Sequence, residues 1–210
     1  MDLSIQKLSK AFNQKQIFQD LTFDVKEGSR FAITGSNGSG KSTLLKILSG
    51  GMLPSSGMIH YVIDGNEIPD QEVFRHVHFV APYNSVIEEL TMKELFQLHK
   101  RLGLLSGFSN FKEWFMLLEY SFNPDQPIKS YSSGMKQRVK LGLTMPDDRP
   151  LILLDEPTSN LDAQGKTWFF KLIDQVSFAK TIIIASNEEA EIRFCTESIN
   201  LEQMTVYQSR

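Results

Sequence analysis

The sequence lacks several features that define particular protein classes. It holds a single cysteine, Cys195, so no disulfide can form within the chain, and this suits a reducing compartment. Its 13 glycines and 8 prolines in 210 residues are near ordinary usage, which excludes collagen-like and low-complexity chains. Because 41% of the residues are apolar and 22% are charged, the chain can bury a hydrophobic core. The composition predicts one large or two small globular domains.

Long apolar segments and basic clusters are missing too. No apolar run approaches the roughly 18 residues that a membrane-spanning helix needs. Residues 1–4 lack the basic head and apolar stretch of a signal peptide, so the chain is expected to stay in the cytoplasm. With 22 Lys and Arg against 25 Asp and Glu, the net charge is −3, and no dense basic stripe is present. No nucleic-acid partner is therefore expected.

The N-terminal part of the chain has the pattern of strands followed by a loop and a helix. Alternating apolar residues predict half-buried antiparallel strands within residues 1–34. The apolar run 30–34 ends in a glycine-rich stretch, and the apolar residues of 43–48 then share one helical face. The next predicted features are a helix stop at Gly50-Gly51, a turn over 54–57 and a strand over 58–63.

The rest of the chain alternates helical and strand patterns. The predicted elements are a helical segment over 91–119, a helix capped by Ser132 or Ser133, a strand over 151–154, a helix over 168–176 and a strand over 181–185. Helices that alternate with short buried strands are typical of an α/β fold with a mainly parallel sheet.

One glycine-rich loop matches the pattern G-x-x-x-x-G-K-[ST] between a predicted strand and a predicted helix, which is the context that supports this motif. The loop consists of Gly35, Ser36, Asn37, Gly38, Ser39, Gly40, Lys41, Ser42 and Thr43. Its backbone N–H groups and the helix N-terminus would point at phosphate oxygens, and Lys41 would reach the β- and γ-phosphates of ATP. The Ser42 hydroxyl is a candidate Mg²⁺ ligand.

Two carboxylates follow the buried strand 151–154. Asp155 and Glu156 lie at its C-terminal end, the edge where open α/β sheets bind ligands. We expect Asp155 to hold Mg²⁺ through water and Glu156 to polarise the water that attacks the phosphate. The sequence thus predicts a site for nucleoside triphosphate hydrolysis.

Three motifs in order give the chain a resemblance to a known family. The loop 35–43, the segment 131–138 (Tyr-Ser-Ser-Gly-Met-Lys-Gln-Arg) and the segment 155–162 (Asp-Glu-Pro-Thr-Ser-Asn-Leu-Asp) look like the nucleotide-binding subunit of an ABC (ATP-binding cassette) transporter. The resemblance covers almost the whole chain, and the Ser-x-Gly signature before the acidic motif is specific to this superfamily.

The resemblance implies the fold and its subdivision. We expect an α/β, P-loop NTPase core with a mainly parallel sheet, an antiparallel β subdomain and a helical subdomain within a single domain, 1–210. The expected ranges are approximately 1–30 and 58–68 for the antiparallel part, 31–57, 69–84 and 135–210 for the nucleotide-binding core, and 85–134 for the helical subdomain.

The resemblance also implies a dimer with shared sites. Two chains would face head to tail, and Ser132, Ser133 and Gly134 of one would bind the γ-phosphate of ATP held by the other. A helix that begins at this serine pair offers free N–H groups to an anion, which agrees with that role. The segment 159–162 matches the family's D-loop at the dimer interface.

An aromatic residue upstream of the loop completes the expected ATP site. Phe12 lies where the family has the ring that stacks on adenine, although a buried strand phenylalanine is the alternative and Phe18 and Phe23 are nearby.

Two positions depart from the family pattern. Asn187 stands where the family normally has a histidine that contacts the γ-phosphate, and its amide can donate a hydrogen bond but cannot carry charge. Pro82 or Tyr83 stands where a glutamine normally senses Mg²⁺ and the membrane partner, and Asn84 could supply an amide there only if the loop shifts.

The favoured function is ATP hydrolysis in a homodimer or heterodimer that drives a separate transmembrane permease. The chain would then lie at the cytoplasmic face of the membrane, attached through that permease, and the exposed face of 86–105 is a candidate docking surface. Alternatives are a nucleotide-binding regulator, a weakly hydrolysing partner in a heterodimer, or an ABC ATPase that acts on DNA or ribosomes.

Overall fold

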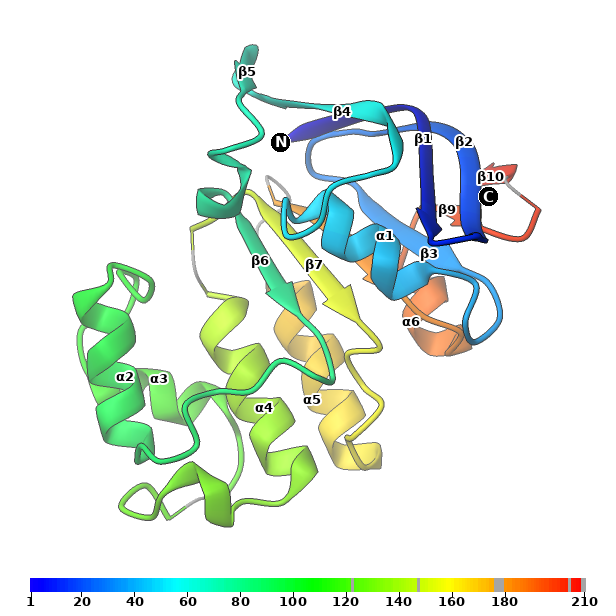
Figure 1. Cartoon of the computed structure of the whole chain (residues 1–210). Coiled ribbons are helices and arrows are strands. Elements are labelled where there is room, and N and C mark those ends of the chain that lie inside the picture. Colours follow the sequence, from blue (N-terminus) through cyan, green and yellow to red (C-terminus); the bar gives the residue numbers. More distant parts are fainter. Residues whose placement is uncertain (122, 147, 176–179, 204, 209–210) are drawn as a thin grey trace. The chain divides into compact units, whose positions relative to one another are not determined.

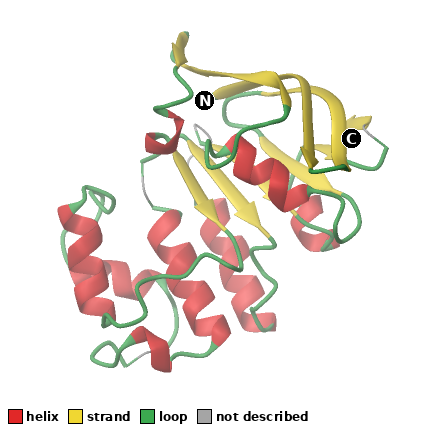
Figure 2. Ribbon diagram, viewed as in Figure 1, coloured by secondary structure: helices red, strands yellow, loops and turns green. Residues whose placement is uncertain are grey.

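The computed structural model describes residues 1–121, 123–146, 148–175, 180–203 and 205–208. The chain divides into two compact units. The first comprises 1–81, 149–156 and 177–210, and the second comprises 82–148 and 157–176. Figures 1 and 2 show that the first unit holds the strands and the second holds helices α2 to α5.

An antiparallel sheet forms one part of the first unit, with strand order β2-β1-β4-β5. The strands are β1 (Asp2–Phe12), β2 (Lys15–Val25), β4 (Ser56–Ile63) and β5 (Asn66–Ile68). Strand β4 begins two residues before the predicted Met58 because Gly57 is part of a β-bulge. Gly57 has a φ of +85°, and the pairing of β1 with β4 shifts register between Gln6 and Ser9.

The second sheet of this unit is mainly parallel, with strand order β10-β9-β3-β8-β7-β6. Its strands are β3 (Arg30–Thr34), β6 (Val77–Val80), β7 (Leu151–Asp155), β8 (Thr181–Ala185), β9 (Glu197–Asn200) and β10 (Thr205–Gln208). Strands β9, β3, β8, β7 and β6 are parallel, and β10 is antiparallel to β9. Figure 1 shows β6 and β7 side by side in the same direction. The predicted α/β fold class is therefore confirmed.

Three short helices complete the described part of the first unit: α1 (Lys41–Leu48), the 3₁₀ helix η1 (Val73–Arg75) and α6 (Glu189–Arg193). A continuous apolar core joins both sheets to α1. Phe23 of β2 stacks on Phe31 of β3 with ring centroids 5.4 Å apart, and Leu44 and Leu45 of α1 are fully buried in the same core. Every residue of β7 and β8 is buried, which fixes the end of β7 where Asp155 lies.

The second unit is helical: α2 (Met92–Arg101), α3 (Phe111–Leu117), the 3₁₀ helix η2 (Ile128–Ser130), α4 (Ser133–Thr144) and α5 (Ala163–Asp174). The predicted helical segment 91–119 contains two short helices, because the chain turns between them with Gly103 at a φ of +75°. Helix α5 begins earlier than the predicted Trp168, because the Asp162 side chain caps it by accepting the Gly165 N–H at 2.7 Å. The predicted last residue of that helix, Val176, lies outside the described residues.

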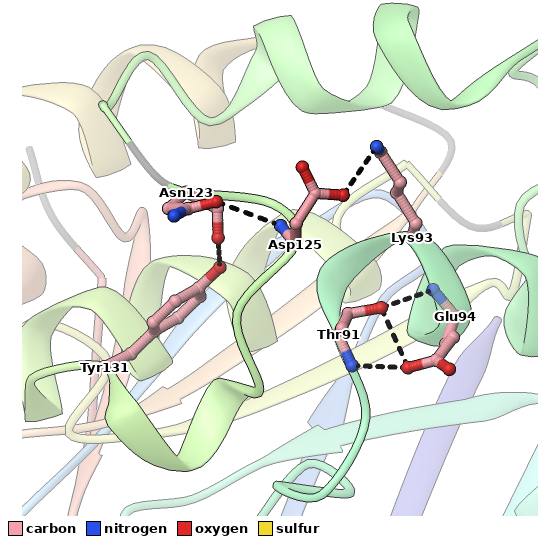
Figure 3. Close-up of polar contacts among 6 residues, drawn as sticks. All are labelled: Thr91, Lys93, Glu94, Asn123, Asp125 and Tyr131. Atoms are coloured by element: carbon pink, nitrogen blue, oxygen red, sulfur yellow. Dashed lines mark hydrogen bonds and ion pairs between the residues drawn. The ribbon is translucent and has the colours of Figure 1, made fainter.

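Local hydrogen bonds define where helix α2 begins (Figure 3). The Thr91 hydroxyl accepts the backbone N–H of Glu94, and the Glu94 carboxylate accepts the backbone N–H of Thr91 at 2.8 Å. This capping box starts α2, and burial of Met92, Leu95 and Phe96 attaches the helix to the unit. The hydrogen bond that the Glu94 carboxylate accepts from the Thr91 backbone holds the pKa of this carboxyl below its usual value.

We predict that Gly57→Ala destabilises the protein far more than Gly65→Ala. Both glycines have positive φ values, +85° and +79°, so both variants carry the cost of about 1–2 kcal/mol for a left-handed residue. A β carbon at Gly57 would lie 2.3 Å from the carbonyl oxygen of Lys7, whereas one at Gly65 would have no neighbour within 4 Å. The additional overpacking should cost about 2 kcal/mol or more in urea unfolding. Equal losses for the two variants would contradict this account of the bulge.

Candidate nucleotide-binding site

The glycine-rich loop lies between the end of β3 and the start of α1, as predicted. Gly35, Gly38 and Gly40 have φ values of +140°, +87° and +104°. A β carbon on Gly40 would lie 2.5 Å from a methyl of Ile17, and one on Gly35 would lie 2.7 Å from the Ser39 hydroxyl. Only glycine allows this tight path, which leaves the loop backbone free to surround an anion.

Lys41 is held inside the loop. Its ammonium donates hydrogen bonds to the carbonyls of Gly35 at 2.6 Å and Ser36 at 3.1 Å, and the residue is 5% exposed. The Ser39 hydroxyl is buried and has no hydrogen-bond partner among the described residues. A buried cation and an unpaired hydroxyl in one glycine loop form a cradle that suits a phosphate group.

Asp155 and Ser42 meet at the end of β7. Asp155 is 2% exposed and hydrogen-bonds to the Ser42 side chain. Burial is the main cause that raises the pKa of the Asp155 carboxyl, and nearby Glu156 adds to it. The Ser42 hydrogen bond and the ammonium groups of Lys41 and Lys46 oppose this rise. The carboxylate therefore lies in a setting that a bound cation would stabilise.

These two oxygen donors fit Mg²⁺. The described residues contain no group of three or more His, Cys, Asp or Glu side chains placed to hold a metal. Mg²⁺ is commonly held by one or two protein oxygens, with phosphates and water completing its octahedron. A hydroxyl and a carboxylate beside a phosphate cradle meet that requirement.

Glu156 follows directly with an unusual backbone. Its φ is +45°, a left-handed conformation that costs a non-glycine residue of the order of 1–3 kcal/mol. Its backbone N–H donates to the carbonyl of Ala185, the last residue of β8, at 2.9 Å. The sheet therefore holds the Glu156 backbone in this strained conformation.

Asn187 reaches the phosphate loop from the end of β8. Its side-chain amide donates to the Asn37 side chain at 3.3 Å, which joins two residues 150 positions apart. In the first unit, the structure thus brings together the loop, Asp155, Glu156 and Asn187.

Phe12, the predicted adenine-stacking residue, is exposed, whereas the other two phenylalanines considered for that role are buried. Phe12 is 44% exposed, and Phe18 and Phe23 are 1% and 5% exposed within the core. The interpretation of Phe12 as a core residue is wrong. The Lys10 ammonium lies 5.0 Å from the centroid of the Phe12 ring, a contact that the sequence pattern did not indicate.

The signature segment lies in the second unit at the start of α4. The Ser132 hydroxyl caps the helix by accepting the Met135 N–H at 3.3 Å, so the predicted cap falls on Ser132, and Ser132 and Ser133 are exposed. A β carbon on Gly134 would lie 2.7 Å from the carbonyl oxygen of Asn160, so only glycine fits there. Just before the helix, the Tyr131 hydroxyl donates to the carbonyl of Asn123 at 2.7 Å (Figure 3).

A small polar cavity of about 110 Å³ lies beside the signature segment. Ser133, Asn84, Lys136 and Lys140 line it with others, and Lys136 forms an ion pair with Glu88 at 2.5 Å. Burial lowers the pKa of the Lys140 ammonium. Asn84, from the segment that lacks the expected glutamine, therefore lines a cavity next to the signature serines.

Two residues of the phosphate-loop region were missed by the sequence analysis. Lys46 influences Asp155 by its charge, and its position one helical turn after Ser42 is the signal that could have indicated it. Glu202 accepts a hydrogen bond from the Ser36 hydroxyl. The two residues are 166 positions apart in the sequence, so no local pattern could indicate this contact.

Comparisons with known proteins agree with this geometry. The model of the family described as ABC transporter matches residues 18–159. The Nod factor export ATP-binding protein I of Ralstonia nicotianae is 29% identical over 203 residues, which are 93% of this chain and 62% of that protein. The chain thus spans less than two thirds of that relative's length.

Solved structures share the fold. A Pyrococcus furiosus protein described as an ABC transporter ATP-binding protein matches with a TM-score of 0.81 and 25% identity over the full length of both chains. A dimeric ATP-binding cassette in a post-hydrolysis state, bound to ADP and Pi, matches with a TM-score of 0.82, 22% identity and 99% coverage of both chains. At 22% identity, the likeness to the dimeric cassette shows only that the two proteins share a fold.

The fold and the glycine-rich loop define a P-loop nucleotide-binding protein of the α/β class. The family match covers more than half of the chain. The chain belongs to the ABC transporter family. Among the described residues, no helix is long and apolar enough to cross a bilayer.

We predict that Asp155→Asn stabilises the nucleotide-free protein at neutral pH. Because burial raises the pKa of Asp155 in the folded state, this carboxyl favours folding most at low pH and loses that contribution as the pH rises through its raised pKa. Asparagine is neutral throughout, so its stability advantage should be largest at pH 7.5 and shrink toward pH 4.5. Chemical unfolding without Mg²⁺ or nucleotide measures this difference.

Asp64→Asn is the matched control, because it removes an exposed carboxylate from the same unit. It should leave the free energy of unfolding within about 0.5 kcal/mol of the wild type. An Asp155→Asn protein that is no more stable than wild type at pH 7.5 would contradict this prediction. It would show that Ser42, Lys41 and Lys46 already offset the cost of burying the carboxylate.

Proposed function

We propose that this chain binds Mg²⁺ and ATP at the loop 35–43 and hydrolyses the γ-phosphate, as the ATPase subunit that drives a separate membrane permease. The observation that carries the proposal is the meeting of Asp155 with Ser42 beside the buried Lys41 ammonium. A cation and an oxygen pair in a glycine-lined cradle are what a metal-bound triphosphate requires.

The phosphates would occupy the cradle. The backbone N–H groups of 36–41 and the Lys41 ammonium would face phosphate oxygens, with Lys41 exchanging its carbonyl partners for them. The Ser39 hydroxyl would then find the acceptor that it lacks. Gly35, Gly38, Gly40 and Thr43 complete the loop.

Ser42 and Asp155 would hold Mg²⁺, Asp155 through water. When bound, the ion would neutralise charge that develops on the phosphate oxygens. The positive charge of the ion would also offset the energetic cost of burying the Asp155 carboxylate.

Glu156 is the proposed general base. Its carboxylate would orient the attacking water and accept its proton, which is the assistance that phosphoryl transfer needs. Asn187, tied to Asn37 of the loop, would donate a hydrogen bond to the γ-phosphate without carrying charge.

The proposed active unit is a dimer. Ser132 and Ser133 are exposed at the start of α4 and would contact the γ-phosphate bound to a partner chain, with Gly134. The dimeric cassette with ADP and Pi is a fold relative that supports this arrangement. We propose a peripheral position at the cytoplasmic face of the membrane through the permease.

A weakly hydrolysing partner of a heterodimer is the second candidate. It is favoured by the neutral Asn187 amide at the position where the family has histidine. Measured turnover of the purified chain separates the two candidates.

We predict that Glu156→Gln lowers steady-state ATP turnover about 100-fold or more and leaves ATP affinity within a few-fold of wild type, because the amide cannot accept the proton. Glu189→Gln, an exposed change on α6, is the control and should keep wild-type turnover. If the wild type binds ATP but hydrolyses it no faster than Glu156→Gln does, the proposal of a hydrolysing homodimer is wrong. The weakly hydrolysing partner of a heterodimer is then the better account.

We also predict that Phe12→Ala weakens ATP binding about 5- to 100-fold, which corresponds to about 1–3 kcal/mol for one stacked base. Phe74→Ala removes another exposed ring, 59% exposed, from the same unit and should not change the affinity. Titration with ATP and with the triphosphate moiety alone measures the effect. If Phe12→Ala weakens binding of both ligands equally, Phe12 does not stack on adenine.

A further inference from the structure

A carboxylate outside the sequence motifs lies at the phosphate loop. Glu202 accepts a hydrogen bond from the hydroxyl of Ser36, the second residue of the loop 35–43. The proposed roles of Asp155 as metal ligand and Glu156 as base do not involve this third carboxylate. A negative charge beside a loop that would hold a polyanion opposes binding, so its presence there requires an explanation.

The turn that carries Glu202 is fixed to the strand that leads into the loop. Strand β9 pairs in parallel with β3, and the Leu201 N–H donates to the carbonyl of Thr34 at 3.0 Å. The Asn200 side chain accepts the backbone N–H of Glu202 at 2.9 Å. Leu201 is 3% exposed, so it anchors the turn in the core, whereas Glu202 is exposed. The carboxylate is thus held beside the loop on a fixed backbone.

Ser36 links this carboxylate to the Lys41 ammonium. The Ser36 carbonyl accepts a hydrogen bond from Lys41 at 3.1 Å, while the Ser36 hydroxyl donates to Glu202. The two opposite charges are therefore joined through one residue of the loop. Glu202 offsets the positive charge of Lys41, and the same negative charge would repel phosphates held in the loop.

Positioning of the loop does not by itself require a charge. The next residue, Asn37, is held by the side-chain amide of Asn187 at 3.3 Å, which is a neutral pair. A glutamine at position 202 could accept the same hydrogen bond from Ser36 through its amide oxygen. The property that glutamate adds is its negative charge, so the distinctive effect of Glu202 on the site is electrostatic.

The charges around the loop do not favour a bare polyanion. The ammonium groups of Lys41 and Lys46 are opposed by the carboxylates of Asp155, Glu156 and Glu202. Free ATP carries about twice the negative charge of its Mg²⁺ complex, so a nearby carboxylate repels it about twice as strongly. A carboxylate bonded to a residue of the loop would lie within the Debye length, about 10 Å at 0.1 M salt, of phosphates in that loop. The repulsion would therefore be only partly screened.

We propose that Glu202 raises the preference of the loop for the Mg²⁺ complex of ATP over free ATP. Glu202 determines this specificity through its charge, without a contact to the nucleotide or to the metal. The inference rests on the proposed function, which supplies both at this site. Asp155, whose charge Mg²⁺ would offset, favours the same form from its buried position, and Glu202 adds to that preference from the exposed side. Free ATP, which lacks the metal that assists hydrolysis, would then compete less for the site.

Equilibrium binding of the nonhydrolysable ATP analogue AMP-PNP tests the proposal. Titration calorimetry on the full chain would give its Kd with Mg²⁺ and with EDTA, at about 0.05 M salt. We expect Glu202→Gln to lower the ratio of Kd in EDTA to Kd in Mg²⁺ at least about threefold, mainly through tighter binding of the free analogue. Glu202→Asp, which keeps the charge, should stay within about twofold of the wild-type ratio. The control is Glu72→Gln, an exposed change beside η1 in the same unit, which should not alter the ratio.

Screening by salt separates the charge of Glu202 from a structural role. At about 1 M salt the Debye length falls to about 3 Å, so the wild type and Glu202→Gln should have the same ratio. Because Glu202→Gln retains an acceptor for the Ser36 hydroxyl, it should unfold at the wild-type temperature. A changed ratio is then not explained by misfolding.

Several outcomes would overturn the role of Glu202. They are an unchanged ratio in Glu202→Gln, an equal change in both Kd values, the same change in Glu202→Asp, or an effect that persists at high salt. If the wild type binds AMP-PNP and one of these results is obtained, the inference on Glu202 fails alone. If the wild type binds the analogue neither with Mg²⁺ nor with EDTA, the proposed function fails.

Discussion

The buried carboxylate of Asp155 is the constraint on which the candidate site depends. A buried charge is costly unless donors or cations face it. Asp155 cannot turn toward solvent, because every residue of β7 and of the neighbouring β8 is buried. The hydrogen bond with the Ser42 side chain and the positive charge of Lys41 therefore stabilise this carboxylate. The glycines of the preceding loop allow the backbone path that places both residues.

Local patterns predicted the parts of the fold that depend on neighbouring residues. The all-apolar runs predicted β7 and β8, and the loop 35–43 between a strand and a helix lies where the motif indicated. The start of α5 was missed because it depends on one cap, Asp162, and not on apolar spacing. The bulge at Gly57 was missed because a glycine after Pro-Ser-Ser also fits a turn.

The site itself was predictable as a set of residues but not as a set of contacts. Alternation along a strand could not decide which phenylalanine is exposed, because the irregular pairing of β1 with β2 shifts which residues face the core. The hydrogen bond between Asn187 and Asn37 joins the ends of two parallel strands that are distant in sequence. Such contacts require the strand order β3-β8-β7, and a single sequence does not specify that order.

The signature helix α4 is fixed in its unit by Arg138. This guanidinium is 2% exposed, lies 4.8 Å from the Trp168 ring centroid and 5.0 Å from that of Tyr120, and donates to the carbonyl of Leu118 at 3.0 Å. Trp168 in turn donates to the carbonyl of Leu117 at 2.8 Å. The exposed Ser132 and Ser133 therefore lie at the beginning of a firmly packed helix. A precise contact with a ligand requires such a rigid support.

The cap of α4 also limits which side chains evolution can place at Ser132. Its hydroxyl accepts the Met135 N–H and still has a proton of its own to give. Aspartate would cap equally well but would bring a negative charge to a surface proposed to meet phosphate, and alanine would lose the cap. A small, uncharged side chain that both accepts and donates a hydrogen bond is needed, and serine, threonine and asparagine meet that requirement.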